Sequence, residues 1–105
     1  MQEIRFIPCK AFKEKPADET KLGFGKKFTD YRFVMDYYDG AWQDARIEPN
    51  EPFQLDAATS VLHYGQAIFE GLKCYRREDG GLQIFRAKDN FARMNRSADR
   101  LAIPL

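Results

Sequence analysis

Few residues of this chain have the type and sequence position expected of a catalytic or ligand-binding residue, and Arg93 is the most specific candidate among them. It stands near the start of a predicted helix, beside the apolar stripe of that helix. A guanidinium is a planar fork of N–H donors that phosphate accepts at two oxygens, and the positive end of a helix strengthens the attraction. Arg93 therefore suits a phosphate site. Its spacing with Arg96 and Arg100, beside Asp99, is equally typical of a solvated helix face.

Aromatic side chains form the second group of candidates. Tyr64, in His63-Tyr64-Gly65, lies between two turn-rich regions, and loops in such places often carry function. Its ring and hydroxyl suit a pocket wall that also orients a polar group, although a tyrosine beside a glycine is commonly structural. Phe24 and Phe69 are weaker candidates, because a lone phenylalanine usually belongs to a core. The fifteen aromatic residues exceed what a minimal core requires, so they indicate a pocket or interface, or simply extra core volume.

Composition excludes several classes of protein. Seventeen basic against sixteen acidic residues give a net charge of +1, without the basic surface that nucleic acid requires. Cys9 and Cys74 are too few and too far apart for a disulfide framework or a zinc site. Cys74, inside a predicted strand, is expected to be a buried free thiol. With His63 as the only histidine, no metal centre of several histidines is expected. The first residues lack the apolar region of a signal peptide, so cytoplasm is expected.

Two hairpins are predicted to position these candidates. Residues 3–9 read as a short edge strand, and residues 10–21 as a surface segment. Residues 28–38 form the clearest strand, which continues through an Asp39-Gly40 turn into a return strand that ends near Pro49. Four side chains share one face of the first strand: Tyr31, Phe33, Met35 and Tyr37. A second hairpin runs from residues 72–77 through a turn at 78–81 to residues 82–85.

One long helix is predicted to follow the hairpins. Its apolar stripe recurs at spacings of three, four and three residues: Phe91, Met94, Ala98 and Leu101. Asp89 or Asn90 is expected to cap its start and Pro104 to stop it, while Ala67 and Ile68 could begin a shorter helical turn. Strands followed by a helix indicate an α+β fold, an antiparallel sheet of hairpins with a packed helix in one domain of residues 1–105. Because the chain ends directly after that helix, we expect it to be a truncated fragment.

The run Leu62-His63-Tyr64-Gly65-Gln66-Ala67-Ile68-Phe69-Glu70-Gly71-Leu72-Lys73 closely resembles a segment of the branched-chain amino acid aminotransferases. That family has His-Tyr-Gly, a few mostly apolar residues, then Phe-Glu-Gly, an apolar residue and a basic one. The resemblance continues upstream at Phe24-Gly25-Lys26, Phe28-Thr29-Asp30, Trp42 and Ala45-Arg46-Ile47 with Pro49. Downstream it includes Phe85-Arg86, Asn90, Arg93-Met94 and Arg96-Ser97-Ala98. It covers nearly everything from Leu22 onward, and nothing in residues 1–21.

The resemblance implies the small N-terminal domain of a fold-type IV enzyme dependent on pyridoxal 5'-phosphate (PLP). It implies transamination of leucine, isoleucine and valine with 2-oxoglutarate, in branched-chain amino acid biosynthesis, by a homodimer. Arg93 matches the arginine that grips the PLP phosphate. Tyr64 matches a tyrosine of the substrate pocket, which the family contributes across the dimer interface. Phe69, and with it Phe24, matches an apolar wall of that pocket.

The catalytic lysine is not implied within these residues, since Lys73 matches the basic residue after Phe-Glu-Gly instead. The fragment alone is therefore expected to be inactive. The alternatives are a D-amino acid aminotransferase or an aminodeoxychorismate lyase of the same fold, or a dimerisation module without catalysis. The residues from Phe24 to Asp30 favour the branched-chain enzymes over the first two.

Overall fold

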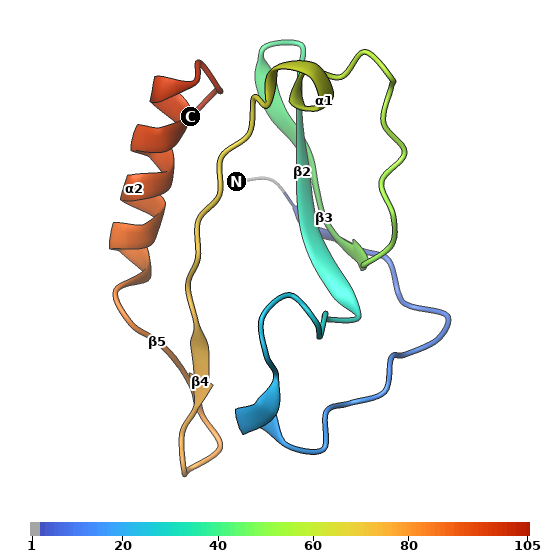
Figure 1. The fold of residues 1–105 in the computed structure, drawn as a ribbon, viewed down its shortest axis with the longest axis vertical. Helices are drawn as coiled ribbons and strands as arrows, with labels where there is room; N and C mark the ends of the chain where they lie inside the picture. Colours follow the sequence, from blue (N-terminus) through green and yellow to red (C-terminus); the bar gives the residue numbers. More distant parts are fainter. Residues whose placement is uncertain (1–2) are drawn as a thin grey trace. The chain divides into compact units, whose positions relative to one another are not determined.

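The computed structural model describes residues 3–105, which divide into two compact units, one that ends at Gln54 and one of Leu55–Leu105. The first unit holds β1 (Arg5–Phe6), a 3₁₀ turn η1 (Glu19–Lys21), β2 (Tyr31–Tyr38) and β3 (Ala41–Pro49). The second holds α1 (Ser60–Tyr64), β4 (Cys74–Arg76), β5 (Leu82–Ile84) and α2 (Ala87–Arg100) (Figure 1). The predicted α+β class is confirmed. The strands form two sheets, of order β1-β3-β2 and β4-β5, and β1 adds to β3 in parallel at an edge.

The hairpin of β2 and β3 follows from its turn residues. Asp39 and Gly40 both adopt positive φ, 50° and 75°, as the two central residues of a type I′ turn do. That turn sets the register Tyr38↔Ala41 and Tyr37↔Trp42. Strand β2 begins at Tyr31 rather than at the predicted Phe28, and just before it the hydroxyl of Thr29 donates to the carbonyl of Tyr31 at 2.6 Å.

A bulge in β3 keeps the apolar side chains on one face of the sheet. Met35 lies opposite two residues, Asp44 and Ala45, since the register passes from Val34↔Arg46 to Asp36↔Gln43. Asp44 has a φ of 56°, and Ala45 is 2% exposed. Trp42 and Ile47, an odd number of residues apart, therefore reach the same face. There the ring of Trp42 meets that of Tyr37 at 5.3 Å, and the ring of Tyr31 meets that of Phe6 at 5.1 Å.

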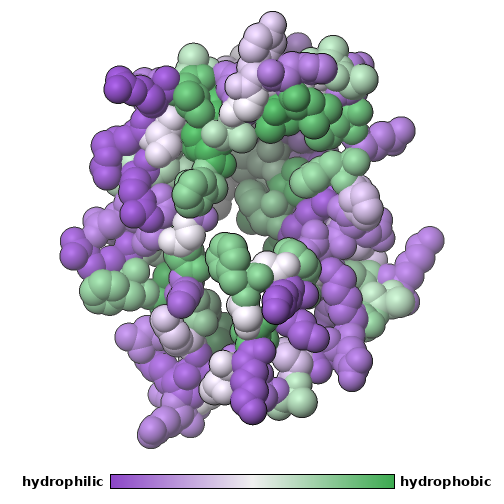
Figure 2. Space-filling view, viewed as in Figure 1, coloured by the Kyte–Doolittle hydropathy of each residue, from purple (hydrophilic) through white to green (hydrophobic). Residues whose placement is uncertain are grey.

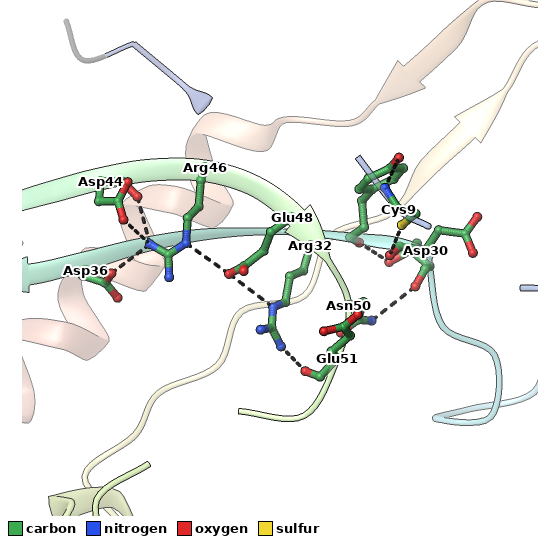
Figure 3. Close-up of polar contacts among 11 residues, drawn as sticks. Cys9, Asp30, Arg32, Asp36, Asp44, Arg46, Glu48, Asn50 and Glu51 are labelled. Carbon is green, nitrogen blue, oxygen red and sulfur yellow. Dashed lines mark hydrogen bonds and ion pairs between the residues drawn. The ribbon is translucent and has the colours of Figure 1, made fainter. Parts of the chain in front are cut away.

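The opposite face of this sheet carries a network of ion pairs (Figure 3). Arg46 lies at its centre: its Nη1 is 2.8 Å from Asp36 and 3.2 Å from Asp44, and its Nε is 3.2 Å from Glu48. Glu48 also lies 3.6 Å from the Nε of Arg32. Two of these ion pairs, Arg32–Glu48 and Arg46–Asp36, join β2 to β3 and so reinforce the register that the bulge sets. We interpret it as a structural feature of the sheet.

The end of α2 differs from the prediction, which relied on Pro104. The helix ends at Arg100, where Ala102 adopts a φ of 55° and its N–H donates to the carbonyl of Asp99 at 3.2 Å. The N–H of Ile103 donates to the carbonyl of Ala98 at 2.9 Å. These two bonds make a Schellman motif, which usually places glycine where Ala102 stands. The helix therefore stops through its own backbone before Pro104 is reached.

Replacing Ala102 with glycine should raise the free energy of unfolding by about 0.5–1 kcal/mol, because glycine adopts positive φ without the steric cost that a Cβ imposes. Urea unfolding of the protein measures the change. The same substitution at Ala92, exposed in the middle of α2, should lower stability by about 0.5–1 kcal/mol. A loss of stability in both variants would contradict the strain assigned to Ala102.

Side chains in both units are largely exposed. Among the described hydrophobic residues only Ala45 and Ala98 are buried, one in each unit. Figure 2 accordingly shows apolar side chains at the surface, interspersed with hydrophilic ones. Cys74 is exposed, so its predicted burial is wrong, and all residues of β4 and β5 are exposed with it. Within residues 3–105 no helix is long and apolar enough to cross a membrane.

Candidate functional site

The candidate site lies in the second unit, where an extended segment runs beside α2 (Figure 1). Helix α1 ends at Gly65, whose φ of 63° is left-handed, and residues 66–73 have no regular structure. The helical turn predicted at Ala67 and Ile68 is therefore wrong. The helix forms instead at Ser60–Tyr64, and Gly65 ends it.

Two side-chain hydrogen bonds hold this segment extended along α2. At one end Gln66 Nε2 donates to the carbonyl of Leu101 at 2.8 Å. At the other, Asn90 Nδ2 donates to the carbonyl of Gly71 at 2.8 Å. Five extended residues span about 16 Å, and the helical stretch from Asn90 to Leu101 also rises about 16 Å. The lengths match, so an extended conformation satisfies both anchors where a helical turn would fall short.

Glu70, on this segment, meets Arg93 of α2. Arg93 Nε donates to Glu70 Oε2 at 2.8 Å, and Arg93 Nη2 contacts Glu70 Oε1. The carboxylate thus accepts both N–H groups along one edge of the guanidinium, the strongest geometry for this pair. Glu70 also accepts from the N–H of Gly71 at 3.1 Å and from Asn90 Nδ2 at 3.3 Å. The side chain of Glu70 is only 7% exposed, whereas that of Arg93 is 61% exposed.

These contacts stabilise the charged form of both partners. The hydrogen bonds from Arg93, with smaller contributions from Asn90 and Gly71, lower the pKa of Glu70 from 4.5 to about 2. The hydrogen bond to Glu70 and its negative charge raise the pKa of Arg93 above its usual range. The pair is therefore fully ionised at neutral pH.

Two of the clefts that Arg93 lines could hold a ligand. The first, the arginine cleft, has a volume of about 320 Å³ and is lined by Phe85, Arg86, Asp89, Asn90, Arg93 and Arg96. Three guanidinium groups against one carboxylate make it suited to an anion. The second, the Phe69 cleft, has a volume of about 430 Å³ and is lined by Ala67, Ile68, Phe69, Glu70, Arg93 and Ser97. Its lining combines apolar side chains with the charged pair of Glu70 and Arg93.

The structure corrects how α2 presents Arg93. The helix begins at Ala87 rather than at Asp89 or Asn90, and its N-cap residue, Arg86, has a φ of 51° and makes no side-chain cap. Asp89 lies in the first turn, where its charge complements the helix dipole, and pairs with Arg86 at 2.6 Å. Arg93 is consequently the seventh helical residue. The dipole field fades beyond the first turn, so the contribution expected from it is small.

The sequence-predicted residues fall in three places. Arg93 and Phe69 both line the Phe69 cleft, and Phe69 is 91% exposed. Tyr64, the last residue of α1, does not line either cleft, and its side chain is 88% exposed. Phe24 belongs to the first unit and is 98% exposed. His63 has a structural role, because its Nε2 hydrogen-bonds the carbonyl of Ala57 at 2.6 Å and so must carry the proton.

Glu70 is a functional candidate that the sequence patterns do not single out, although it stands in the middle of the Phe-Glu-Gly motif. An acidic residue between Phe69 and Gly71 could have indicated a carboxylate near an apolar surface, and a buried carboxylate needs a charged or hydrogen-bonding partner. Its partner, 23 residues further along the chain, could not be inferred from local periodicity.

No protein-family model matches the chain. Curated proteins match it closely. It is 54% identical over 94 residues to the branched-chain-amino-acid transaminase 1 of Bacillus subtilis (strain 168). The aligned residues cover 89% of this chain and 26% of that protein. It is 49% identical over 104 residues to the branched-chain-amino-acid aminotransferase 2 of the same organism, covering 98% of this chain and 28% of that protein.

A third relative comes from another organism. The branched-chain-amino-acid aminotransferase of Mycolicibacterium smegmatis (strain ATCC 700084 / mc(2)155) is 53% identical over 83 residues, or 78% of this chain and 23% of that protein. The chain spans about a quarter of the length of the curated relatives it matches. The resemblance seen in the motifs is thereby confirmed, and it extends into residues 1–21, where none was predicted.

Proposed function

We propose, from the premise that this chain is homologous to the N-terminal part of the branched-chain-amino-acid aminotransferases, that the whole protein transfers the amino group of leucine, isoleucine or valine to 2-oxoglutarate with PLP as cofactor. The observation that carries the proposal is the ion pair of Arg93 and Glu70. It leaves one edge of a guanidinium open beside a cleft that three arginines line.

The arginines that line the arginine cleft support the proposal that it holds the phosphate of PLP. Glu70 occupies the Nε and Nη2 side of Arg93, so Nη1 and the second hydrogen of Nη2 remain for phosphate oxygens. Arg93 would hold the phosphate, and Arg86 and Arg96 would add positive charge around it. PLP, when bound, supplies the electron sink for a carbanion at the substrate Cα.

Aromatic side chains would make the substrate pocket apolar. Phe69 stands beside Arg93, and Tyr64 and Phe24 are the other walls that the family resemblance assigns. A branched aliphatic side chain buried against such walls gains from the removal of apolar surface from water. One methylene in such a pocket is worth only ~1–3 kcal/mol, so leucine, isoleucine and valine should all be accepted.

The proposal also includes a homodimer. A tyrosine whose side chain is 88% exposed, like Tyr64, suits a position that completes the pocket of a second subunit. The catalytic lysine, in this proposal, is contributed by residues outside these 105. The 105 residues alone would then bind substrate or cofactor weakly and would not catalyse transamination.

The test uses the whole protein loaded with PLP, with the visible absorbance of the cofactor followed as single amino acids are added. L-Leucine, L-isoleucine and L-glutamate should change the spectrum, whereas D-alanine should not. A response to D-alanine alone would overturn the proposal in favour of a D-amino acid aminotransferase. Absence of bound PLP would favour a dimerisation module without catalysis.

A further inference from the structure

We propose that Glu70 is a positioning residue, which holds the guanidinium of Arg93 by one edge so that the other edge is fixed toward the phosphate of the cofactor. The inference rests on the proposed function, since it deepens the role of Arg93 there. The family pattern assigns no role to Glu70, whereas the geometry of its pair with Arg93 indicates one.

The first step is the planarity of the guanidinium. Glu70 accepts from Nε at 2.8 Å and contacts Nη2, so both of its carboxylate oxygens are engaged. A planar guanidinium that is held at two points along one edge cannot rotate about the side-chain bonds that lead to it. The direction of the opposite edge is thereby set. Within residues 3–105 the Nη1 atom of Arg93 has no hydrogen-bond partner, so that edge is available to a ligand.

The second step is the rigidity of Glu70 itself. Its Oε1 accepts from the backbone N–H of Gly71 at 3.1 Å and from Asn90 Nδ2 at 3.3 Å. The same Asn90 nitrogen donates to the carbonyl of Gly71 at 2.8 Å, so Asn90 joins α2 to the segment at this point. A carboxylate that is 7% exposed and held by two donors besides Arg93 can orient an arginine side chain that is itself 61% exposed. Without Glu70, Arg93 would sample many rotamers and lose entropy on each binding event.

The third step separates positioning from simple electrostatics. A carboxylate beside a phosphate site repels the phosphate, so its neutralisation should strengthen binding if charge alone mattered. A positioning role predicts that neutralising Glu70 weakens phosphate binding, because the mobile guanidinium of Arg93 must then lose conformational freedom when the phosphate binds. The two accounts therefore differ in the sign of the effect.

The experiment measures the dissociation constants of PLP and of pyridoxal, which lacks the phosphate, for the whole protein and its Glu70→Gln variant. We expect Glu70→Gln to weaken PLP binding by about 10-fold, the effect typical of losing a group that orients a ligand-holding side chain. Pyridoxal affinity should not change. Glu78→Gln, an exposed glutamate in the turn between β4 and β5, is the matched control and should bind both as the wild type does. Glu70→Asp, which keeps the charge on a shorter stem, should also weaken PLP binding selectively, and it serves if Glu70→Gln does not fold.

Unchanged or tighter PLP binding in the Glu70 variants would overturn the positioning role. An equal loss for PLP and pyridoxal would also overturn it, because a general structural defect acts on both. Failure of the proposed function gives a different result: the wild type itself would then bind PLP no better than pyridoxal, or not at all. The two failures are thus distinguishable in one set of titrations.

Discussion

Replacing Arg93 by alanine is expected to weaken PLP binding by the whole protein about 100-fold, without changing its affinity for pyridoxal. The variant removes a bidentate, charge-assisted contact to phosphate. Such hydrogen bonds contribute about 1.5–3 kcal/mol each, and about 3 kcal/mol in total corresponds to two decades of affinity. Equilibrium titration after removal of the cofactor by dialysis measures the change.

The control for this variant concerns Glu70, whose nearly buried carboxylate loses its partner when Arg93 is removed. The double variant Arg93→Ala with Glu70→Gln relieves that unpaired charge, so a loss of PLP affinity that persists in it belongs to the phosphate contact. Arg100→Ala, at the other end of α2, should leave PLP affinity unchanged. Cofactor retention equal to the wild type in Arg93→Ala would remove Arg93 from the proposed site.

The second large effect concerns acid. Because the folded-state pKa of Glu70 is depressed to about 2 from 4.5, the stability that its ion pair contributes is fully present above about pH 4.5 and is lost as the pH falls through about 2. Below that range protonated Glu70 can no longer accept both hydrogen bonds of Arg93. The other charged groups at the neighbouring cleft are Arg86, Asp89 and Arg96. The expected result is that wild-type stability declines more steeply between pH 4.5 and 2 than the stability of Glu70→Gln.

Urea midpoints at pH 6, 4, 3 and 2 for the wild type, Glu70→Gln and Glu78→Gln measure this difference. Glu78→Gln should follow the wild type, because Glu78 is exposed in a turn. Parallel curves for all three proteins would show that the Glu70 pair adds nothing to stability. Other carboxylates titrate in the same range, which is why the comparison uses the difference between variants rather than the wild-type curve alone.

Local chemistry explains which elements the sequence predicted. The Asp39-Gly40 turn needs positive φ at two positions, and these two residue types tolerate it, so the first hairpin could be read directly. The stripe from Phe91 to Ala98 predicted α2 because its spacing is helical. Its start was misplaced, since Arg86 caps it with a left-handed backbone and no side-chain hydrogen bond, a feature without a sequence signal.

The errors arose where distant residues decide local structure. Ala67 and Ile68 have no local reason to stay extended, yet contacts from Gln66 to Leu101 and from Asn90 to Gly71 hold them so. Family resemblance pointed to Arg93 but was silent on Glu70, because a motif marks a residue without naming its partner. The two hairpin patterns likewise could not predict that the strands form two separate sheets, because a hairpin pattern describes only the pairing of neighbouring strands.

The parallel pairing of β1 with β3 has a consequence for the order of folding. The β2–β3 hairpin joins neighbours in sequence through a two-residue turn, and such hairpins form within about 1–10 μs. Strand β1 pairs with β3 only at Arg5↔Arg46 and Phe6↔Ile47, and the N–H of Ile7 adds a hydrogen bond to the carbonyl of Ile47 at 2.9 Å. Because β1 and β3 are far apart in the sequence, this pairing must close a long loop. In native-state hydrogen exchange, the amide of Ile7 should therefore open before those of the β2–β3 hairpin. The first edge of the sheet is the last part to assemble and the first to be released.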